Sequence, residues 1–253
     1  KLLAISPESL EKKPEAKKRT LRELQNAVEG NVVMRIAPFP SGPLHIGNAK
    51  PIVLNDEYVR MYGGKLLLVI DDTIGSEEKA IVPEAYDLIP EGLAWLGVNY
   101  YEHPIYKSDR LPIYYEYAEK LIEKEGAYVC NCPQDELRRN RVDKLDCNHR
   151  KQGTQHHLFQ WKRMLAGALK QGEAILRLKT SMQDPNPAFR DRVLFRIADR
   201  EHARTGKKYF VWPLLEFSWA IDDQLLGITH ILRGKELMME TQMQEFIWDI
   251  FGW

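Results

Sequence analysis

The sequence predicts an α/β fold in which a parallel, Rossmann-like nucleotide-binding sheet forms the framework. Two apolar segments, VVMRIAP at 32–38 and KLLLVIDD at 65–72, have the character of buried strands. Helical segments follow them at 44–62 and, despite Pro90, at 83–97. Alternating strands and helices are typical of a parallel sheet with helices on both faces, in which ligands bind beyond the carboxyl ends of the strands.

Composition favours a globular protein without a membrane segment. The chain has 253 residues, 44% of them hydrophobic, which is enough for a sizeable core and for two domains. Lys plus Arg equal Asp plus Glu at 36 each, so net charge neither supports nor excludes a nucleic-acid partner. No apolar run is long enough to span a membrane, and the first residues lack a signal-peptide core, so we expect a cytoplasmic location. Because the chain starts at Lys1 and ends at Trp253, we interpret it as an excerpt of a longer one.

Four regions follow from the distribution of charges, breakers and apolar runs. Residues 1–30 form a charged arm, 31–100 the first half of the nucleotide-binding domain, 101–211 an insertion, and 212–253 the second half of that domain. Within the first half, the helix at 44–62 is expected to keep one face near the sheet, with Ile46, Val53, Leu54 and Tyr58 on it. A helix in the insertion should bury Ile113, Tyr117 and Leu121, and the last region should contain a helix at 211–227 and a strand at 228–234.

The stretch SGPLHIG at 41–47 has the chemistry of an anion site. A glycine-containing turn that leads into a helix N-terminus presents unpaired N–H groups and the positive end of the helix dipole. Gly47 would let a phosphate or a flat ring approach closely, and His45 could donate a hydrogen bond to a phosphoryl oxygen. A lone loop histidine is equally compatible with no catalytic role.

The three cysteines lie together in one segment and predict a metal site. Cys130, Cys132, Cys147 and His149 form a C-x-C…C-x-H set. Four such ligands suit tetrahedral zinc with no open position, which is typical of a structural site. The alternative is three buried thiols beside a surface histidine.

Several motifs together resemble the class I aminoacyl-tRNA synthetases. RIAPFPSGPLHIGNAK at 35–50 is similar to their His-Ile-Gly-His signature, and its arginine and prolines resemble the glutamyl and glutaminyl branch. Further ordered matches cover nearly everything after residue 30, among them SDRLPIYYEYAEKLIEKEGAYVC at 108–130 and DDQLLGITHILRGKE at 222–236. The sequences of residues 172–191 and 207–214 resemble those of archaeal glutamyl-tRNA synthetases most.

The resemblance implies ATP-dependent glutamate activation, with Mg²⁺, and transfer of the acyl group to the acceptor end of tRNA by a monomer. His45 and Asn48 would be catalytic. ATP would contact Gly42, His45, Gly47, Asn48 and Glu236, and glutamate would contact Arg35, Asp71 and Arg233. The insertion would hold the tRNA, with RRNR at 138–141, Lys144 and Arg150 as candidate phosphate contacts.

Some positions depart from the family pattern. Asn48 replaces the second signature histidine, and Val69, Ile74 and Gly75 replace polar or proline positions near the second strand end, so we expect that end to have lost polar groups. Leu215 replaces a tyrosine of the glutaminyl branch. The lysine-containing second signature loop and an anticodon-binding domain are missing from these residues, so the chain is expected to bind substrates but to activate them poorly. A glutaminyl-tRNA synthetase, disfavoured by LRGKE, and a non-catalytic nucleotide- or tRNA-binding module are the alternatives.

Overall fold

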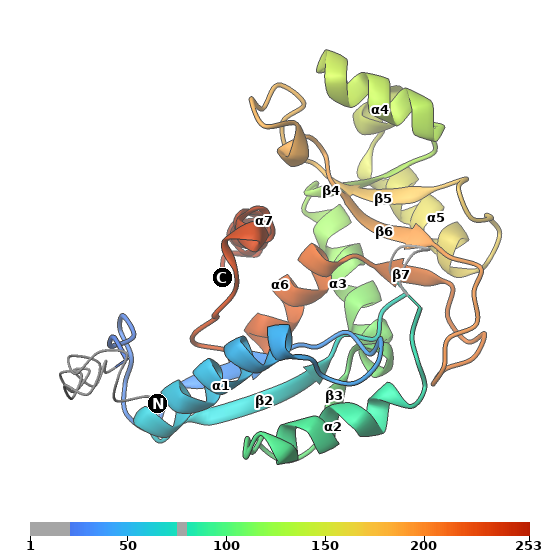
Figure 1. Cartoon of the computed structure of the whole chain (residues 1–253). Coiled ribbons are helices and arrows are strands. Elements are labelled where there is room, and N and C mark those ends of the chain that lie inside the picture. Colours follow the sequence, from blue (N-terminus) through green and yellow to red (C-terminus); the bar gives the residue numbers. More distant parts are fainter. Residues whose placement is uncertain (1–20, 75–79) are drawn as a thin grey trace, which may run out of the picture.

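A three-stranded parallel sheet confirms the predicted α/β class. The computed structural model describes residues 21–74 and 80–253, so most of the predicted arm and Gly75 lie outside the described residues. Strands β1 (Val33–Ile36), β2 (Lys65–Ile70) and β3 (Ile105–Tyr106) pair in that order, with helices α1 (Ile46–Met61) and α2 (Ala85–Trp95) between them (Figure 1). The carboxyl ends of β1, β2 and β3 therefore lie at the same edge.

Alternation along the strands decides what each face of this sheet contacts. Side chains of one face pack against α1 and α2 in one core, which includes Met34, Ile36, Leu66, Leu68, Ile70, Ile52, Ile89 and Leu93. Arg35 and Val69 alternate with these residues, and Arg35 pairs with α6 (Leu215–Leu225). Helices thus lie on both faces, as the sequence predicts.

A second, antiparallel sheet lies at the other end of the molecule. It contains β4 (Ala127–Cys130), β5 (Ile175–Leu178), β6 (Val193–Ile197) and β7 (Val211–Pro213) in that order. Helices α4 (Gln134–Asp143) and α5 (Thr154–Leu165) belong to this unit, while α3 (Leu111–Glu123), α6 and α7 (Met238–Phe251) lie between it and the parallel sheet (Figure 1). One core around Trp161, Phe195 and Phe217 joins α3, α5, α6, α7 and the antiparallel sheet.

Two sequence-based details of this architecture are wrong, and two are only partly right. Residues 211–213 are β7 rather than the start of α6. No strand forms at 228–234 among the described residues, because only Thr229 and His230 hydrogen-bond to Val33 before the chain turns away. Ile46 and Val53 are exposed, and the buried positions of α1 are Ile52, Asn55, Asp56 and Tyr58. In α3 the fully buried positions include Leu111, Tyr114, Ala118 and Leu121, with Ile113 and Tyr117 only partly buried.

Over residues 21–74 and 80–253, no helix combines the length and the apolar character needed to cross a membrane.

Candidate functional site

His45 and Asn48 form the N-terminal cap of α1. The Nδ1 atom of His45 accepts a hydrogen bond from the Gly47 N–H at 3.0 Å, and Asn48 Oδ1 accepts one from the His45 N–H at 3.1 Å. This reciprocal arrangement is a capping box, which satisfies two N–H groups of the helix start. A Cβ atom on Gly47 would lie 2.8 Å from His45 Cε1, so the glycine makes room for the imidazole.

The capping box also fixes which atoms these side chains present outward. Because Nδ1 of His45 accepts, its Nε2 carries the proton and is left as a donor. Because Oδ1 of Asn48 accepts, its Nδ2 amide is left as a donor as well. His45 is exposed and Asn48 half-buried, so two N–H donors stand at the positive end of the α1 dipole. This arrangement suits an anionic oxygen.

A cavity of about 300 Å³ lies between α1, the end of β1 and the segment 232–237. Four predicted ligand-binding residues line it: Arg35, Asn48, Arg233 and Glu236. Most of the other walls are apolar and include Ile36, Ala37, Pro38, Pro51, Ile52, Trp219, Leu232 and Leu237. Gly42, His45 and Gly47 precede or begin α1 outside this lining, and Asp71 does not line the cavity either. An apolar slot with a few polar groups is the usual form of a small-molecule site.

Arg35 is already engaged by a carboxylate of the protein. Its Nε and Nη2 atoms donate to the two oxygens of Asp223 on α6, the second at 2.8 Å, and both residues are buried. The guanidinium carbon lies 4.6 Å from the ring centre of Trp219. Asp223 also accepts from Gln244 at 2.8 Å. Arg35 therefore reaches the cavity as part of a fixed network.

Arg233 is differently placed. Its Nη1 donates to Gln244 at 2.5 Å and to Thr241 at 3.2 Å, whereas its buried Nη2 has no hydrogen-bond partner and lies 3.8 Å from an Asp223 oxygen. Burial and the neighbouring Arg35 lower the pKa of Arg233 to about 10. A buried guanidinium with a free N–H is costly, and a carboxylate ligand would offset that cost.

Asp71 follows the carboxyl end of β2 and is held from two sides. Its Oδ2 lies 3.2 Å from the Nζ of Lys107, and its Oδ1 accepts from Thr73 at 3.1 Å. Val69 and Ile74 are buried and apolar, as the sequence predicts, yet the strand end keeps polar partners because Lys107 reaches it from beyond β3. The loss of polar groups expected from the sequence is thus only partial.

Asp72 is the centre of a further buried network that the sequence analysis missed. It accepts from the N–H and Oγ of Ser108 and from Tyr86, at 2.7–3.0 Å. The backbone oxygen of Asp72 lies 2.6 Å from His202 Nε2, and His202 stacks on Trp212. Burial lowers the pKa of His202. The adjacent acids Asp222 and Asp223 within an apolar helical run were one available signal of buried ion pairs, whereas Lys107 and His202 had none.

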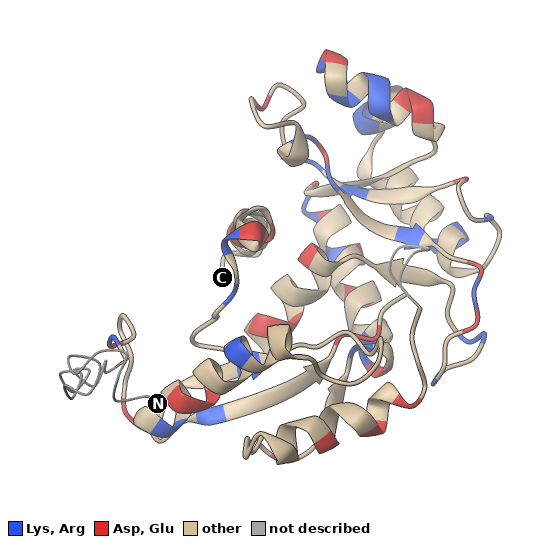
Figure 2. Ribbon diagram, viewed as in Figure 1, with Lys and Arg blue, Asp and Glu red and all other residues tan. Residues whose placement is uncertain are grey.

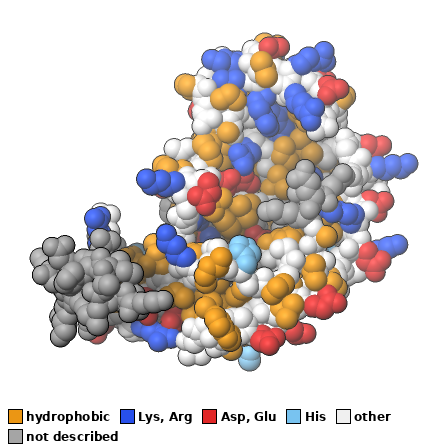
Figure 3. Space-filling view, in the orientation of Figure 1, with side chains coloured by type: hydrophobic (Ala, Val, Ile, Leu, Met, Phe, Trp, Pro, Cys, Tyr) orange, Lys and Arg blue, Asp and Glu red, His pale blue; other side chains and the backbone are white. Residues whose placement is uncertain are grey.

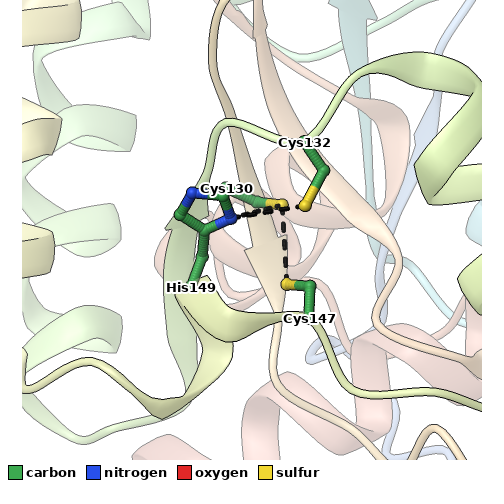
Figure 4. A group of neighbouring side chains, drawn as sticks. All are labelled: Cys130, Cys132, Cys147 and His149. Atoms are coloured by element: carbon green, nitrogen blue, oxygen red, sulfur yellow. Dashed lines mark hydrogen bonds between the residues drawn. The ribbon is translucent and has the colours of Figure 1, made fainter.

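Cys130, Cys132, Cys147 and His149 come together at the end of β4 and in the turn Asn148–Lys151 (Figure 4). Their potential ligand atoms all lie within 4.8 Å of one another. The Cys130 and Cys147 sulfurs are 3.8 Å apart, and His149 Nδ1 is 3.3 Å from Cys132 and 3.8 Å from Cys130. Tetrahedral zinc with ordinary bond lengths separates its sulfur and nitrogen ligands by about 3.5–3.8 Å, so the set fits this ion.

The surroundings favour thiolate at Cys147 but not at Cys130 or Cys132, and at Cys132 burial raises the pKa. The hydrogen bond from Cys130 lowers the pKa of Cys147 to about 4, while the same contact raises the pKa of Cys130. The guanidinium of Arg177, which is buried, lies 3.9 Å from both sulfurs through Nη1. Thiolate is the form in which cysteine binds a metal, and a nearby cation offsets its charge.

The candidate phosphate-binding residues of the insertion divide into two groups. Arg138 and Arg139 are exposed on α4, a helix that carries both basic and acidic positions (Figure 2). Lys and Arg side chains gather at this end of the molecule in the space-filling view (Figure 3). Arg150 instead pairs with the buried Asp191 at 2.8 Å and donates to Thr180 O, so its guanidinium holds the insertion together. Arg141 contributes to the same packing, because its backbone carbonyl accepts a hydrogen bond from the Arg190 guanidinium.

Comparison with known proteins supplies the family. Residues 31–253 match the model of the catalytic domain of tRNA synthetases class I (E and Q). The chain belongs to this family. It is 46% identical over 244 residues to a glutamate–tRNA ligase of Methanothermobacter marburgensis, covering 96% of the chain and 43% of that protein. It is 47% identical over 253 residues to the glutamate–tRNA ligase of Methanococcus maripaludis strain C7, covering 100% of the chain and 44% of that protein.

The fold of this synthetase chain has solved counterparts. A glutamate tRNA ligase from Elizabethkingia meningosepticum, crystallised with its amino acid, superposes with a TM-score of 0.65 at 20% identity, over 88% of this chain and 47% of that one. At that identity the likeness concerns the fold alone. The chain spans less than half the length of the relatives it matches.

Proposed function

We propose that this chain carries the part of a glutamate–tRNA ligase that binds ATP and L-glutamate and forms the glutamyl-adenylate. The observation that carries the proposal is the cavity in which Asn48, Arg35, Arg233 and Glu236 meet, beside a capped helix start whose free donors suit phosphate. The 46–47% identity to glutamate–tRNA ligases over almost the whole chain supports it.

Within this cavity Arg233 is the proposed first contact for the side-chain carboxylate of glutamate. Its Nη2 is buried, unpartnered and set between the charges of Arg35 and Asp223. Arg35 keeps its proposed place in the glutamate site, but its Nε and Nη2 atoms already donate to Asp223. We therefore assign Arg35 the role of supporting the wall of the pocket that Trp219 forms. Arg233 shares the single carboxylate of Asp223 with Arg35, and glutamine would add no second negative charge, so this arrangement favours glutamate.

The proposed chemistry starts with the α-carboxylate of glutamate. One of its oxygens attacks the α-phosphorus of Mg·ATP, a new P–O bond forms, and the bond to the leaving pyrophosphate breaks. His45 Nε2–H and Asn48 Nδ2–H would donate to phosphate oxygens whose charge grows in that step. Asp71 would hold the α-ammonium, and Gly42, Gly47 and Glu236 would contact the nucleotide. A terminal ribose hydroxyl of tRNA then attacks the acyl carbon, and AMP leaves.

Zinc is the proposed ion of the Cys130, Cys132, Cys147 and His149 cluster. The spacing of the ligand atoms and the charge of Arg177 support this choice. With four protein ligands the ion would have no open position, so its role would be structural. It would tie β4 to the turn Asn148–Lys151.

The tRNA acceptor end is the proposed macromolecular partner of the unit that contains β4–β7, with Arg138, Arg139 and Lys144 as exposed candidate contacts. We propose that 31–100 and 212–253 form the catalytic domain and 101–211 the insertion. A cytoplasmic monomer without a membrane partner is the proposed state of the protein.

Calorimetric titration with two non-hydrolysable adenylate analogues tests the proposed activity. The glutamyl analogue should bind this chain at least about tenfold more tightly than the glutaminyl analogue. Replacing Arg233 with Leu should remove that preference, whereas the matched change Arg138→Leu on exposed α4 should not. Preference for the glutaminyl analogue would indicate the glutaminyl enzyme, and binding of neither would favour a non-catalytic module.

A further inference from the structure

Lys107 is a lysine whose side chain is fully buried. Lys107 begins the 3₁₀ turn Lys107–Arg110 that follows β3, and its exposed fraction is 0%. Burying an ammonium group is costly unless it is paired and hydrogen-bonded. Burial lowers the pKa of this lysine, and the nearby Asp71 and Asp222 oppose that shift. The contacts of the buried Lys107 amino group show which side chains it holds in place.

Those contacts all lead to the proposed amino-acid site. The Nζ atom lies 3.2 Å from Asp71 Oδ2, donates to Ser218 Oγ at 2.9 Å, and lies 5.3 Å from the ring centre of Trp219. Trp219 lines the cavity and also lies against Arg35 and Arg233. Lys107 does not line the cavity, so it can act on a ligand only through these neighbours.

The Asp71 carboxylate is the neighbour that Lys107 constrains most directly. Lys107 holds Oδ2 and Thr73 holds Oδ1. Two partners on opposite oxygens fix the rotation of the carboxylate and leave one lone pair on each oxygen for a further donor. Without Lys107 the carboxylate would keep only the Thr73 contact.

The turn itself has other anchors. Ser108 holds Asp72 through its N–H and hydroxyl, and Arg110 pairs with Asp222 at 2.7 Å. These contacts do not involve the Lys107 ammonium. Removing that ammonium should therefore change the orientation of Asp71 more than the path of the chain.

We propose that Lys107 is a positioning residue for amino-acid recognition: it fixes the Asp71 carboxylate and so the site that receives the substrate α-ammonium. This inference rests on the proposed function, in which Asp71 holds that ammonium. A role of Lys107 in recognition would depend on the α-amino group of the ligand, whereas a role in stability alone would not.

The test uses two ligands and a matched control variant. The ligands are the non-hydrolysable glutamyl-adenylate analogue and the same molecule without its α-amino group. Lys107→Met should weaken the glutamyl analogue about tenfold or more and the desamino analogue less than about threefold. The control Arg110→Met removes another cation of the same turn, half-buried and in contact with Asp222 rather than Asp71, and should not produce this selective loss.

Ser218→Ala keeps the test open if Lys107→Met does not fold. It removes one uncharged acceptor of the ammonium and leaves the ion pair with Asp71 in place, and it should cause a smaller loss confined to the glutamyl analogue. Equal losses for both ligands, or none in Lys107→Met, would overturn the inference about Lys107 alone. If the unaltered chain does not prefer the glutamyl over the desamino analogue, the Asp71 site is wrong and the proposed function fails with it.

Discussion

Replacing Asp223 with Ala should destabilise the protein more than any exposed change of the same kind. Asp223 is 2% exposed, and its two oxygens accept hydrogen bonds from Nε and Nη2 of Arg35. It also accepts one from Gln244 at 2.8 Å and lies 3.8 Å from Nη2 of Arg233. Without it two buried guanidinium groups lose their common counter-ion. Removing one partner of a buried pair costs about 3–5 kcal/mol. For a chain of this size that corresponds to a fall in Tm of roughly 6–20 °C.

Thermal unfolding followed by circular dichroism measures this change, and Glu116→Ala is the control. Glu116 pairs with Lys120 at 2.6 Å, but the two side chains are 61% and 44% exposed, so its loss should cost no more than about 0.5 kcal/mol. Asp223→Asn keeps the shape and one acceptor and should fall between the two. A Tm for Asp223→Ala equal to that of Glu116→Ala would refute the view that the Arg35–Asp223–Arg233 network is held by charge.

Three further predictions concern the helix cap, one histidine and the metal site. Gly47→Ala should displace the His45 imidazole and, like His45→Ala, cost about 1 kcal/mol by urea unfolding and weaken binding of the glutamyl-adenylate analogue. Gly153→Ala at the N-cap of α5, with open space at its Cβ, should leave binding of the analogue unchanged. The folded pKa of His202 lies below its unfolded value of about 6.5, so the stability contributed by neutral His202 is present above that pH. It declines as pH falls, by up to about 1.4 kcal/mol per pH unit. His202→Gln should therefore flatten the profile of Tm against pH, and an unchanged slope would contradict the burial argument. If the proposed zinc is bound, Arg177→Met should lower its affinity about tenfold or more in competition with a chelator, because the sulfurs lose a cation at 3.9 Å. The control Arg190→Met should retain the metal, because the Arg190 guanidinium donates to the backbone oxygens of Asp184, Arg141 and Pro185.

The parallel sheet could be predicted because its strands carry their own signal. Residues 33–36 and 65–70 are apolar except for Arg35 and Lys65, and a helical segment follows each of them in the sequence. The strand expected at 228–234 has the less apolar sequence ITHILRG, and only Thr229 and His230 hydrogen-bond to β1, while Leu232 and the residues after it line the cavity. The pairing with β1 therefore ends at His230, where the chain begins to form the wall of the cavity. The exposure of Ile46, beside the capping His45, could not be read from helical spacing either.

The sequence predicted four residues that line the cavity, but it did not predict the contacts that hold them. Arg35, Asn48, Arg233 and Glu236 line one cavity although up to about 200 residues separate them in the chain. The occupation of Arg35 by Asp223, the support of Asp71 by Lys107 and the link from Asp72 to His202 were missed. Each joins residues 36 to 188 positions apart in the sequence, where no local periodicity exists to report a contact.

A crystal structure of this chain with the non-hydrolysable glutamyl-adenylate analogue would test the central claim most directly. We predict density for the ligand in the cavity between α1 and the segment 232–237, with the side-chain carboxylate bonded to Nη2 of Arg233, the phosphate beside His45 and Asn48, and the Arg35–Asp223 pair intact. A ligand bound elsewhere, or a carboxylate that displaces Asp223 from Arg35 and leaves Arg233 unpaired, would contradict it.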